Sequence, residues 1–292
     1  MAPLFASCHD NRNGHGEFSR LPWRRGWCNP AGSLRTNIGQ LRDMGMAAAR
    51  DRTTRPRPRR RWFRNFFLAG TLLVVVALTF RQGWIPARYT PLPRLDLSYP
   101  VPFIMDWQLA ELRFDRRLCK AVLSSSPKLT ASPIADRPFQ GGCGWRNAAR
   151  ITKVDGAEFS VRRVACPVAA ALAMWVMHDV QPLARRILGQ SVSKIQNFGT
   201  YSCRNIIGSK FWKNRRSEHA SANAIDISGF QLADGTKISV AGDWAGGGKK
   251  TEFLRAVHVS ACSYFRVTLG PDFNAAHKDH FHFDRGILFT CR

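Results

Sequence analysis

The chain has 292 residues, of which 44 are basic and 20 acidic, so its formal net charge is +24. Hydrophobic residues make up 45% of it, which is enough for a packed core and excludes a chain that is disordered throughout. The length allows one or two domains. The excess of positive charge favours an anionic partner, either a nucleic acid, a cell-surface polymer or a lipid surface.

The first 65 residues form a basic leader. They contain 14 arginines, no lysine and 4 acidic residues. Apolar residues in this stretch follow neither a helical nor a strand period. We therefore predict that residues 1–65 are disordered.

An apolar stretch follows this leader. Phe66 to Phe80 reads FFLAGTLLVVVALTF, and seven arginines lie in the 15 residues before it. A basic flank before an apolar run is typical of a signal sequence or a signal anchor. Because no small-x-small cleavage site follows, we favour an uncleaved transmembrane anchor over 66–85, with a cleaved signal peptide as the alternative. The positive-inside rule then predicts a single-pass inner-membrane protein with a cytoplasmic leader and a periplasmic C-terminal domain.

Residues 86–102 are rich in proline and predict an extended linker. The folded domain is expected over 103–292. The strongest helix signal within it runs from Cys166 to Leu188, with a kink expected at Pro182. A second helix is predicted from Thr251 to Tyr264. Strands are predicted over 150–154, 193–198, 224–230, 237–240, 265–269 and 281–283, with a hairpin turn at 232–235. This mixed order indicates an α+β fold, an antiparallel sheet with flanking helices.

Six cysteines lie in the predicted domain. They are widely spaced and form no CxxC pair, which favours disulfides in an oxidising compartment over a zinc finger. The alternative is buried free thiols in a cytosolic protein. The sequence does not choose among the possible pairings of Cys119, Cys143, Cys166, Cys203, Cys262 and Cys291.

Four of the eight histidines lie in two short segments. These read SEHASANAIDI over 217–227 and HKDHFHFD over 277–284. The spacing of seven between His219 and Asp226 lets a loop fold back beside a strand. On a second strand, His280 and His282 point to one face and the two phenylalanines to the other. Since zinc in enzymes takes three protein ligands and a water, we predict Zn²⁺ bound by His219, Asp226 and His282.

A zinc-bound water is a competent nucleophile near neutral pH. A nearby base must then carry its proton to the leaving amine. His280 and His277 are the candidates for this base, and Asp279 or Asp284 could orient them. The pattern predicts amide hydrolysis without a covalent intermediate. The competing interpretation is a set of surface histidines and an aspartate that stabilises a turn.

The two histidine segments resemble the bacterial extensin-like C-terminal domain family. They also resemble the LAS group of zinc peptidases, which includes lysostaphin-like enzymes, D-Ala-D-Ala carboxypeptidases and hedgehog-type domains. The HxDHFH stretch is most similar to the murein endopeptidase branch. The resemblance covers roughly Leu95 to Arg285, including GCGW at 142–145 and YSCRN at 201–205. It implies a LAS metallopeptidase-like fold.

In the LAS group the S-x-H-x6-D and H-x-H segments supply zinc ligands. The resemblance thus implies His219, Asp226 and His282 as ligands, with His280 and His277 in proton transfer or transition-state stabilisation. The carboxypeptidase branch has a glutamate base in ExxHxH, and this chain has His277 or Asp279 in that region. The resemblance therefore does not identify the base.

Basic residues flank the histidine segments and indicate how a substrate is held. Arg204 and the Arg215–Arg216 pair are expected either to bind a peptide carboxylate or to be solvated surface charges. We expect Ser217 to contact the substrate as well. Trp212 either lines a groove or belongs to the core.

Two further features lie near these segments in our interpretation. Residues 246–249 lack the spacing of a phosphate loop, and we expect a mobile loop near the site. Cys143 and Cys203 lie beside the segments shared with the family, and we expect disulfide partners there rather than catalytic thiols.

These observations predict a membrane-anchored zinc peptidase that acts on peptidoglycan or another cell-wall polymer. The alternative is a non-catalytic wall-binding module in which the metal is structural. Nucleic-acid binding is not expected, because membrane topology explains the densest arginine run and no DNA- or RNA-binding motif occurs. The oligomeric state is not predicted.

Overall fold

The structure is a computed structural model that describes residues 59–82, 84, 93–208 and 210–292. The chain divides into two units, Met1–Pro56 and Arg57–Arg292, and all described residues belong to the second. The prediction of a disordered leader therefore falls, for residues 1–58, outside the described residues. The same holds for residues 86–92 of the predicted linker, whereas residues 59–65 of the leader are helical, contrary to the prediction.

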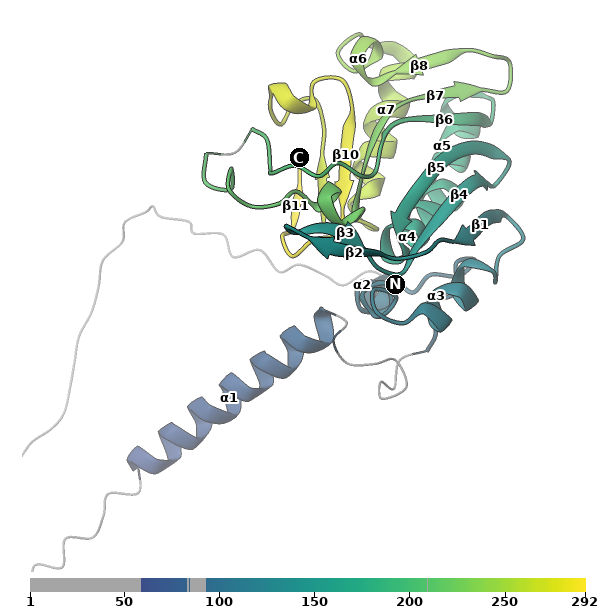
Figure 1. Cartoon of the computed structure of the whole chain (residues 1–292). Helices are drawn as coiled ribbons and strands as arrows, with labels where there is room; N and C mark the ends of the chain where they lie inside the picture. Colours follow the sequence, from purple (N-terminus) through teal and green to yellow (C-terminus); the bar gives the residue numbers. More distant parts are fainter. Residues whose placement is uncertain (1–58, 83, 85–92, 209) are drawn as a thin grey trace, which may run out of the picture. The chain divides into compact units, whose positions relative to one another are not determined.

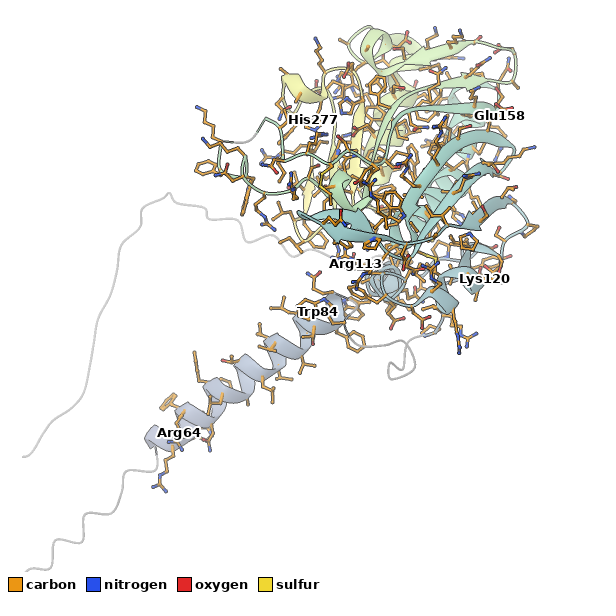
Figure 2. All side chains as sticks on the ribbon, in the orientation of Figure 1. Arg64, Trp84, Arg113, Lys120, Glu158 and His277 are labelled. Carbon is orange, nitrogen blue, oxygen red and sulfur yellow. A yellow bond between two sulfur atoms is a disulfide. The ribbon has the colours of Figure 1, made fainter. Side chains whose placement is uncertain are left out.

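The first helix, α1 (Arg59–Arg81), contains the predicted apolar segment. Among the described residues, α1 is the one helix long and apolar enough to cross a membrane, over Arg61–Phe80. Twenty helical residues span about 30 Å, the thickness of a bilayer's hydrocarbon core. The apolar side chains of this stretch are exposed along the helix (Figure 2). A single membrane pass is consistent with this helix.

The domain is built on one large, mostly antiparallel sheet (Figure 1). Its strands run in the order β1-β4-β5-β6-β7-β10-β9-β11, and β8 also pairs with β7. Parallel pairing occurs between β5 and β6 and between β9 and β11. The strands are β1 (Leu129–Pro133), β4 (Ala148–Val154), β5 (Ala157–Ala165), β6 (Val192–Gly199), β7 (Ala224–Leu232), β8 (Lys237–Ser239), β9 (Val267–Leu269), β10 (Phe281–Asp284) and β11 (Thr290–Cys291).

Helices cover one face of this sheet (Figure 1). The predicted helix over 166–188 forms as α4 (Cys166–Trp175) and α5 (Gln181–Leu183), each followed by a π-helical segment, Val176–Val180 and Ala184–Leu188. Pro182, which has no N–H to donate, lies between these π segments, and such wider turns accommodate a missing helical hydrogen bond. The second predicted helix is α7 (Gly248–Ala261). Smaller helices are α2 (Pro102–Glu111), α3 (Arg116–Leu123) and α6 (Val240–Asp243).

The core lies between the sheet and these helices. Trp175 of α4 packs edge-on against Phe283 of β10, and Phe230 of β7 packs against Phe253 of α7. Leu95 and Leu97 are also buried, so core contacts begin inside the range 86–102 that we predicted as a linker. The α+β class is confirmed.

The opposite face of the sheet is left free of helices over β4 and β5. Along these strands the buried side chains alternate with exposed ones, as expected for a sheet with one solvated face. Asp226 of β7 lies on the same open face, because its neighbours Ile225 and Ile227 point into the core. A short hairpin, β2 (Arg137–Gln140) with β3 (Cys143–Trp145), completes the strands.

All six cysteines of the domain form disulfides, which confirms the prediction from their spacing. The pairs are Cys119–Cys166, Cys143–Cys203 and Cys262–Cys291. The second pair joins β3 to the loop before the first histidine segment. It therefore fixes that loop over the open face of the sheet.

Candidate metal centre

The three predicted ligands come from two adjacent strands and one turn. Asp226 of β7 and His282 of β10 are direct partners in the antiparallel register. His219 lies on a short 3-10 turn (Glu218–Ser221), whose first residue is preceded by Ser217 as N-cap. Ala222 ends the turn in the left-handed region, with φ of 54°. This reversal returns the chain directly to β7, so the spacing of seven brings His219 back beside Asp226.

The ligand atoms of these three residues converge. His219 Nε2 is 3.1 Å from Asp226 Oδ1 and 3.2 Å from His282 Nδ1. His282 Nδ1 is 3.0 Å from the same Asp226 oxygen. The three atoms lie close enough together to hold one metal ion. The side chains are shielded from solvent, with exposed fractions of 3% for His219, 14% for Asp226 and 10% for His282.

The outer nitrogen of each histidine ligand faces an acceptor. His219 Nδ1 lies 3.3 Å from the Thr200 carbonyl oxygen, and His282 Nε2 lies 3.1 Å from Asp284 Oδ2. With a metal bound, the single N–H of each neutral imidazole would lie on the outer nitrogen, where these acceptors can receive it. The inner nitrogens then present lone pairs to the common point that the Asp226 oxygen also faces. Three electron-rich atoms at one point fit a metal cation, and metal-bound histidines have such outer partners.

Charge at this point is also favourable for a cation. Burial by itself raises the pKa of Asp226, but hydrogen bonds with His219 and His282 outweigh it and hold that pKa far below its ordinary value. Burial lowers the pKa of His282, and its bonds to Asp226 and Asp284 overcome this and raise that pKa to about 9. The two carboxylates therefore make the site attract positive charge, whether a proton or a metal ion.

Two more histidines lie beside the three ligands. His280 Nε2 is 3.5 Å from Asp226 Oδ1, and His280 Nδ1 is 2.9 Å from Asp279 Oδ1. His277 Nδ1 is 2.8 Å from Asn274 Oδ1. Burial, with the nearby His282 and His280, lowers the pKa of His277 to about 4. His277 is therefore neutral at pH 7.

The orienting carboxylates divide their roles. We expected Asp279 or Asp284 to orient the base. Asp279 contacts His280, whereas Asp284 contacts the ligand His282 and also accepts a hydrogen bond from the Gly286 amide. The two aspartates thus hold different histidines.

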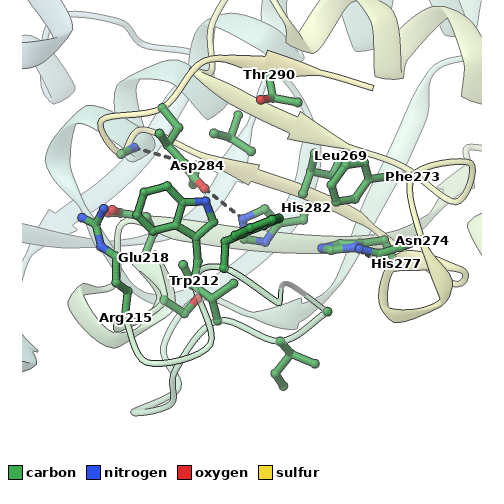
Figure 3. A pocket seen from close by; sticks show the side chains of 18 of the residues that line it. Trp212, Arg215, Glu218, Leu269, Phe273, Asn274, His277, His282, Asp284 and Thr290 are labelled. Atoms are coloured by element: carbon green, nitrogen blue, oxygen red, sulfur yellow. Dashed lines mark hydrogen bonds and ion pairs between the residues drawn. The ribbon is translucent and has the colours of Figure 1, made fainter.

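A pocket of about 580 Å³ opens beside these residues. Figure 3 shows His282, His277 and Asp284 among its lining residues, with Trp212 and Phe273 nearby. Its apolar wall comes from two segments far apart in the sequence, one near residue 210 and one near the C-terminus: Ile206, Ile207, Phe211, Trp212, Phe273 and Leu288. Trp212 therefore lines a groove, which was one of the two alternatives for it.

The structure brings all four predicted substrate contacts to this pocket. Arg204, Arg215, Arg216 and Ser217 all line it. Arg215 lies over the ring of Trp212, 4.9 Å from its centroid. Arg216 is committed to the protein itself, since it donates to the Gly141 carbonyl and to Asn205 Oδ1. Ser217 Oγ accepts from the His219 amide at 3.3 Å.

The glycine-rich segment over 246–249 does not take part. It forms a turn and the start of α7, and it contributes no lining residue to the pocket. Our expectation of a loop near the site is wrong, because the segment belongs to the helical layer on the other side of the sheet.

Sequence reasoning missed three contributors. The Thr200 carbonyl and Asn274 orient His219 and His277, and Glu218 lines the pocket. Burial and the nearby Asp284 raise the pKa of Glu218. Glu218 was visible as the neighbour of His219 in the sequence. A backbone carbonyl such as that of Thr200 gives no signal in the sequence.

The family model described as extensin-like protein C-terminus matches residues 117–292, which include every residue of this site. The chain belongs to this family. The matched range contains the three disulfides and both histidine segments. No curated protein and no solved structure matches the chain. The family assignment therefore rests on the match to the family model, and the candidate site rests on the positions of its side chains.

Proposed function

We propose that this protein is a zinc-dependent hydrolase that cleaves amide bonds in the peptides of peptidoglycan. The convergence of His219 Nε2, Asp226 Oδ1 and His282 Nδ1 carries this proposal. In a tetrahedral site with bonds of about 2.0–2.1 Å, two ligand atoms are about 3.3 Å apart. The observed separations of 3.0–3.2 Å are close to that value.

When bound, zinc would supply an acidic water and polarise the substrate carbonyl. The histidines around it supply the proton transfer. Asp279 accepts the Nδ1–H of His280, so the lone pair of Nε2 faces the site and can take a proton. Once protonated, His280 donates to Asp226 and holds the proton until the amine leaves with it. His277, neutral at pH 7, is the second group able to exchange a proton at the pocket wall.

The pocket supports a peptide substrate. Arg204 lines it and has no carboxylate partner among the described residues, so its guanidinium is available for a peptide carboxylate. The S-x-H-x6-D and H-x-H segments resemble those of LAS-type zinc peptidases, which supports the same chemistry. The membrane-crossing length of α1 supports a single-pass anchor. The proposal assigns this anchor to the inner membrane and the domain to the periplasm, where this substrate lies.

The test uses the full-length protein in neutral detergent. We expect one zinc per chain by elemental analysis and release of soluble peptides from purified peptidoglycan. His280→Ala should retain zinc and lose release by about 100-fold or more. Asp234→Asn, on an exposed turn away from the site, should change neither.

Two results would reject the proposal. One is a wild-type protein without stoichiometric zinc. The other is a zinc-loaded wild type that binds peptidoglycan without releasing peptides, which would indicate a wall-binding module with a structural metal.

A further inference from the structure

The open face of the sheet carries a second cluster of functional groups, separate from the metal centre. Around Arg150, the register of β4 and β5 shifts: Ala149 pairs with Val164, and Ile151 pairs with Val161. One residue of β4 therefore faces two of β5, Arg162 and Arg163. This is a β-bulge, and a bulge redirects side chains that a regular strand would send to opposite faces.

The bulge gathers three arginines on the solvated side. Arg150 and Arg162 are exposed and Arg163 is half-buried, and all three line a shallow hollow of about 700 Å³ with Trp145. Thr152 and Ser160 add hydroxyl groups to the same hollow. It therefore offers cationic, hydroxyl and aromatic groups together.

Among the described residues, none of these three arginines has a carboxylate partner. The nearby acids are paired elsewhere: Asp136 with Arg116, and Glu158 with Lys194. Glu158 also lies on the far side of the domain from His277 (Figure 2). The hollow is thus a patch of uncompensated positive charge.

Aromatic rings hold part of this patch in place. The Arg163 guanidinium lies 5.4 Å from the Trp145 ring centroid and 5.7 Å from that of Tyr201. Arg137 lies over the same two rings at 5.5 Å. Stacking on rings leaves the N–H edges of a guanidinium free to bind an anion and reduces the entropy lost on binding.

The cluster is connected to the metal centre through one residue. Thr200 Oγ1 donates to the Arg163 carbonyl, while the Thr200 carbonyl faces His219 Nδ1. Arg163 lies on β5, two strands from Asp226 on β7. At about 4.8 Å per strand, the two backbones are on the order of 10 Å apart. A polymer chain can therefore span both sites.

We propose that the arginine bulge, formed by Arg150, Arg162 and Arg163 with Trp145, binds an anionic carbohydrate polymer of the cell wall. Arginines recognise carboxylate or phosphate groups in bidentate fashion, and Trp145 with the two hydroxyls suits the sugar units between them. The choice of a wall polymer as the occupant rests on the proposed function. The anion site itself does not, because it shares no side chain with the metal ligands.

The test measures binding of full-length protein, in neutral detergent, to fluorescein-labelled polygalacturonate by anisotropy. Dextran of similar length is the neutral comparison, and a 30-residue single-stranded DNA is the other polyanion. The variant R150Q/R162Q/R163Q removes the cluster. The matched control R117Q/R185Q/R186Q removes the same charge from exposed helix positions outside the hollow.

We expect the cluster variant to bind polygalacturonate at least about tenfold more weakly, and the control less than about twofold more weakly. Arg150→Gln alone should show part of this loss. Equal losses in the two triple variants would overturn the proposal, since total charge would then explain binding. Tighter binding of the DNA than of the glycan, lost in the cluster variant, would overturn the choice of polymer.

The variant Asp226→Asn separates this proposal from the proposed function. It should lose zinc and keep wild-type affinity for polygalacturonate. Loss of glycan binding in this variant would contradict an independent anion site. Absence of zinc from the wild type, with cluster-dependent glycan binding intact, would reject the hydrolase and leave the arginine bulge supported.

Discussion

Asp226 and His282 are cross-strand partners on β7 and β10, and their Oδ1 and Nδ1 atoms lie 3.0 Å apart on the open face of the sheet. The register that pairs them also sends Ile225, Ile227, Phe281 and Phe283 into the core. A slip of one residue would bury the ligands and expose the core residues. The packing of the domain therefore fixes the geometry of the candidate site.

Removing the shared carboxylate tests the ligand set. Asp226→Asn takes away the one charged oxygen that both histidine ligands face, so we expect zinc affinity to fall by about 100-fold or more. Chelator competition followed by elemental analysis measures this. Asp234→Asn should keep the wild-type affinity. A variant at Asp226 that binds zinc as the wild type does would show that the three side chains are not a metal site.

Asp284 is expected to act through His282 rather than on the metal. In Asp284→Asn the side-chain oxygen can still accept from the Gly286 amide, while the amide nitrogen faces His282 Nε2. His282 then favours the other tautomer, with its proton on the metal side. We expect zinc affinity about 10–100-fold lower. Unaltered affinity would mean that Asp284 does not set the tautomer.

A buried ionic network attaches α2 to the sheet. Asp106 bonds to Arg266 and Arg285, whose side chains are only 3% and 4% exposed. Asp106→Ala leaves two buried guanidinium groups without that carboxylate, so we expect a loss of about 3–5 kcal/mol in the free energy of unfolding. Urea denaturation measures it.

The exposed pair of Glu158 and Lys194 is the control for this network. Glu158→Gln should cost less than about 1 kcal/mol. Similar losses in the free energy of unfolding for the two variants would show that the buried Asp106 network contributes no more to stability than an exposed ion pair.

His258 should make stability depend on pH. Burial lowers its pKa to about 4, with Arg255 adding to this effect and a backbone bond to Leu269 and the charge of Asp272 opposing it. In the unfolded chain a histidine titrates near 6.5. The contribution of His258 to the free energy of unfolding is therefore fully present above pH about 6.5. It is lost as the pH falls toward 4, because the unfolded chain takes up the proton first. The total is about 3 kcal/mol.

Unfolding of the wild type and of His258→Gln at pH 7.5, 6 and 5 checks this. The variant should lose less stability than the wild type over this range, since its side chain does not titrate. Parallel pH profiles for the two proteins would assign the acid sensitivity to other groups.

The sequence by itself determined the local features of this protein. Alternation of apolar and polar residues predicted the strand that carries Asp226 and the HFHF strand, because a strand buries every second side chain. The same spacing predicted the ligand set His219, Asp226 and His282, and the apolar run predicted α1. Widely spaced cysteines predicted disulfides, but of the three pairs only Cys143–Cys203 was expected from the sequence.

Only the tertiary structure decided which distant groups meet. The pairings Cys119–Cys166 and Cys262–Cys291, the contact of Asp284 with His282 and the pocket wall formed by Trp212 and Phe273 all depend on how the strands are ordered. The arginine bulge arises from one extra residue in a strand pairing. The role of the Thr200 carbonyl was not predictable either, because every residue has the same backbone carbonyl. The periodicity of a strand predicts the face of the sheet on which a side chain lies. Its neighbour on the next strand depends on the strand order, which is set by the packing of the whole chain.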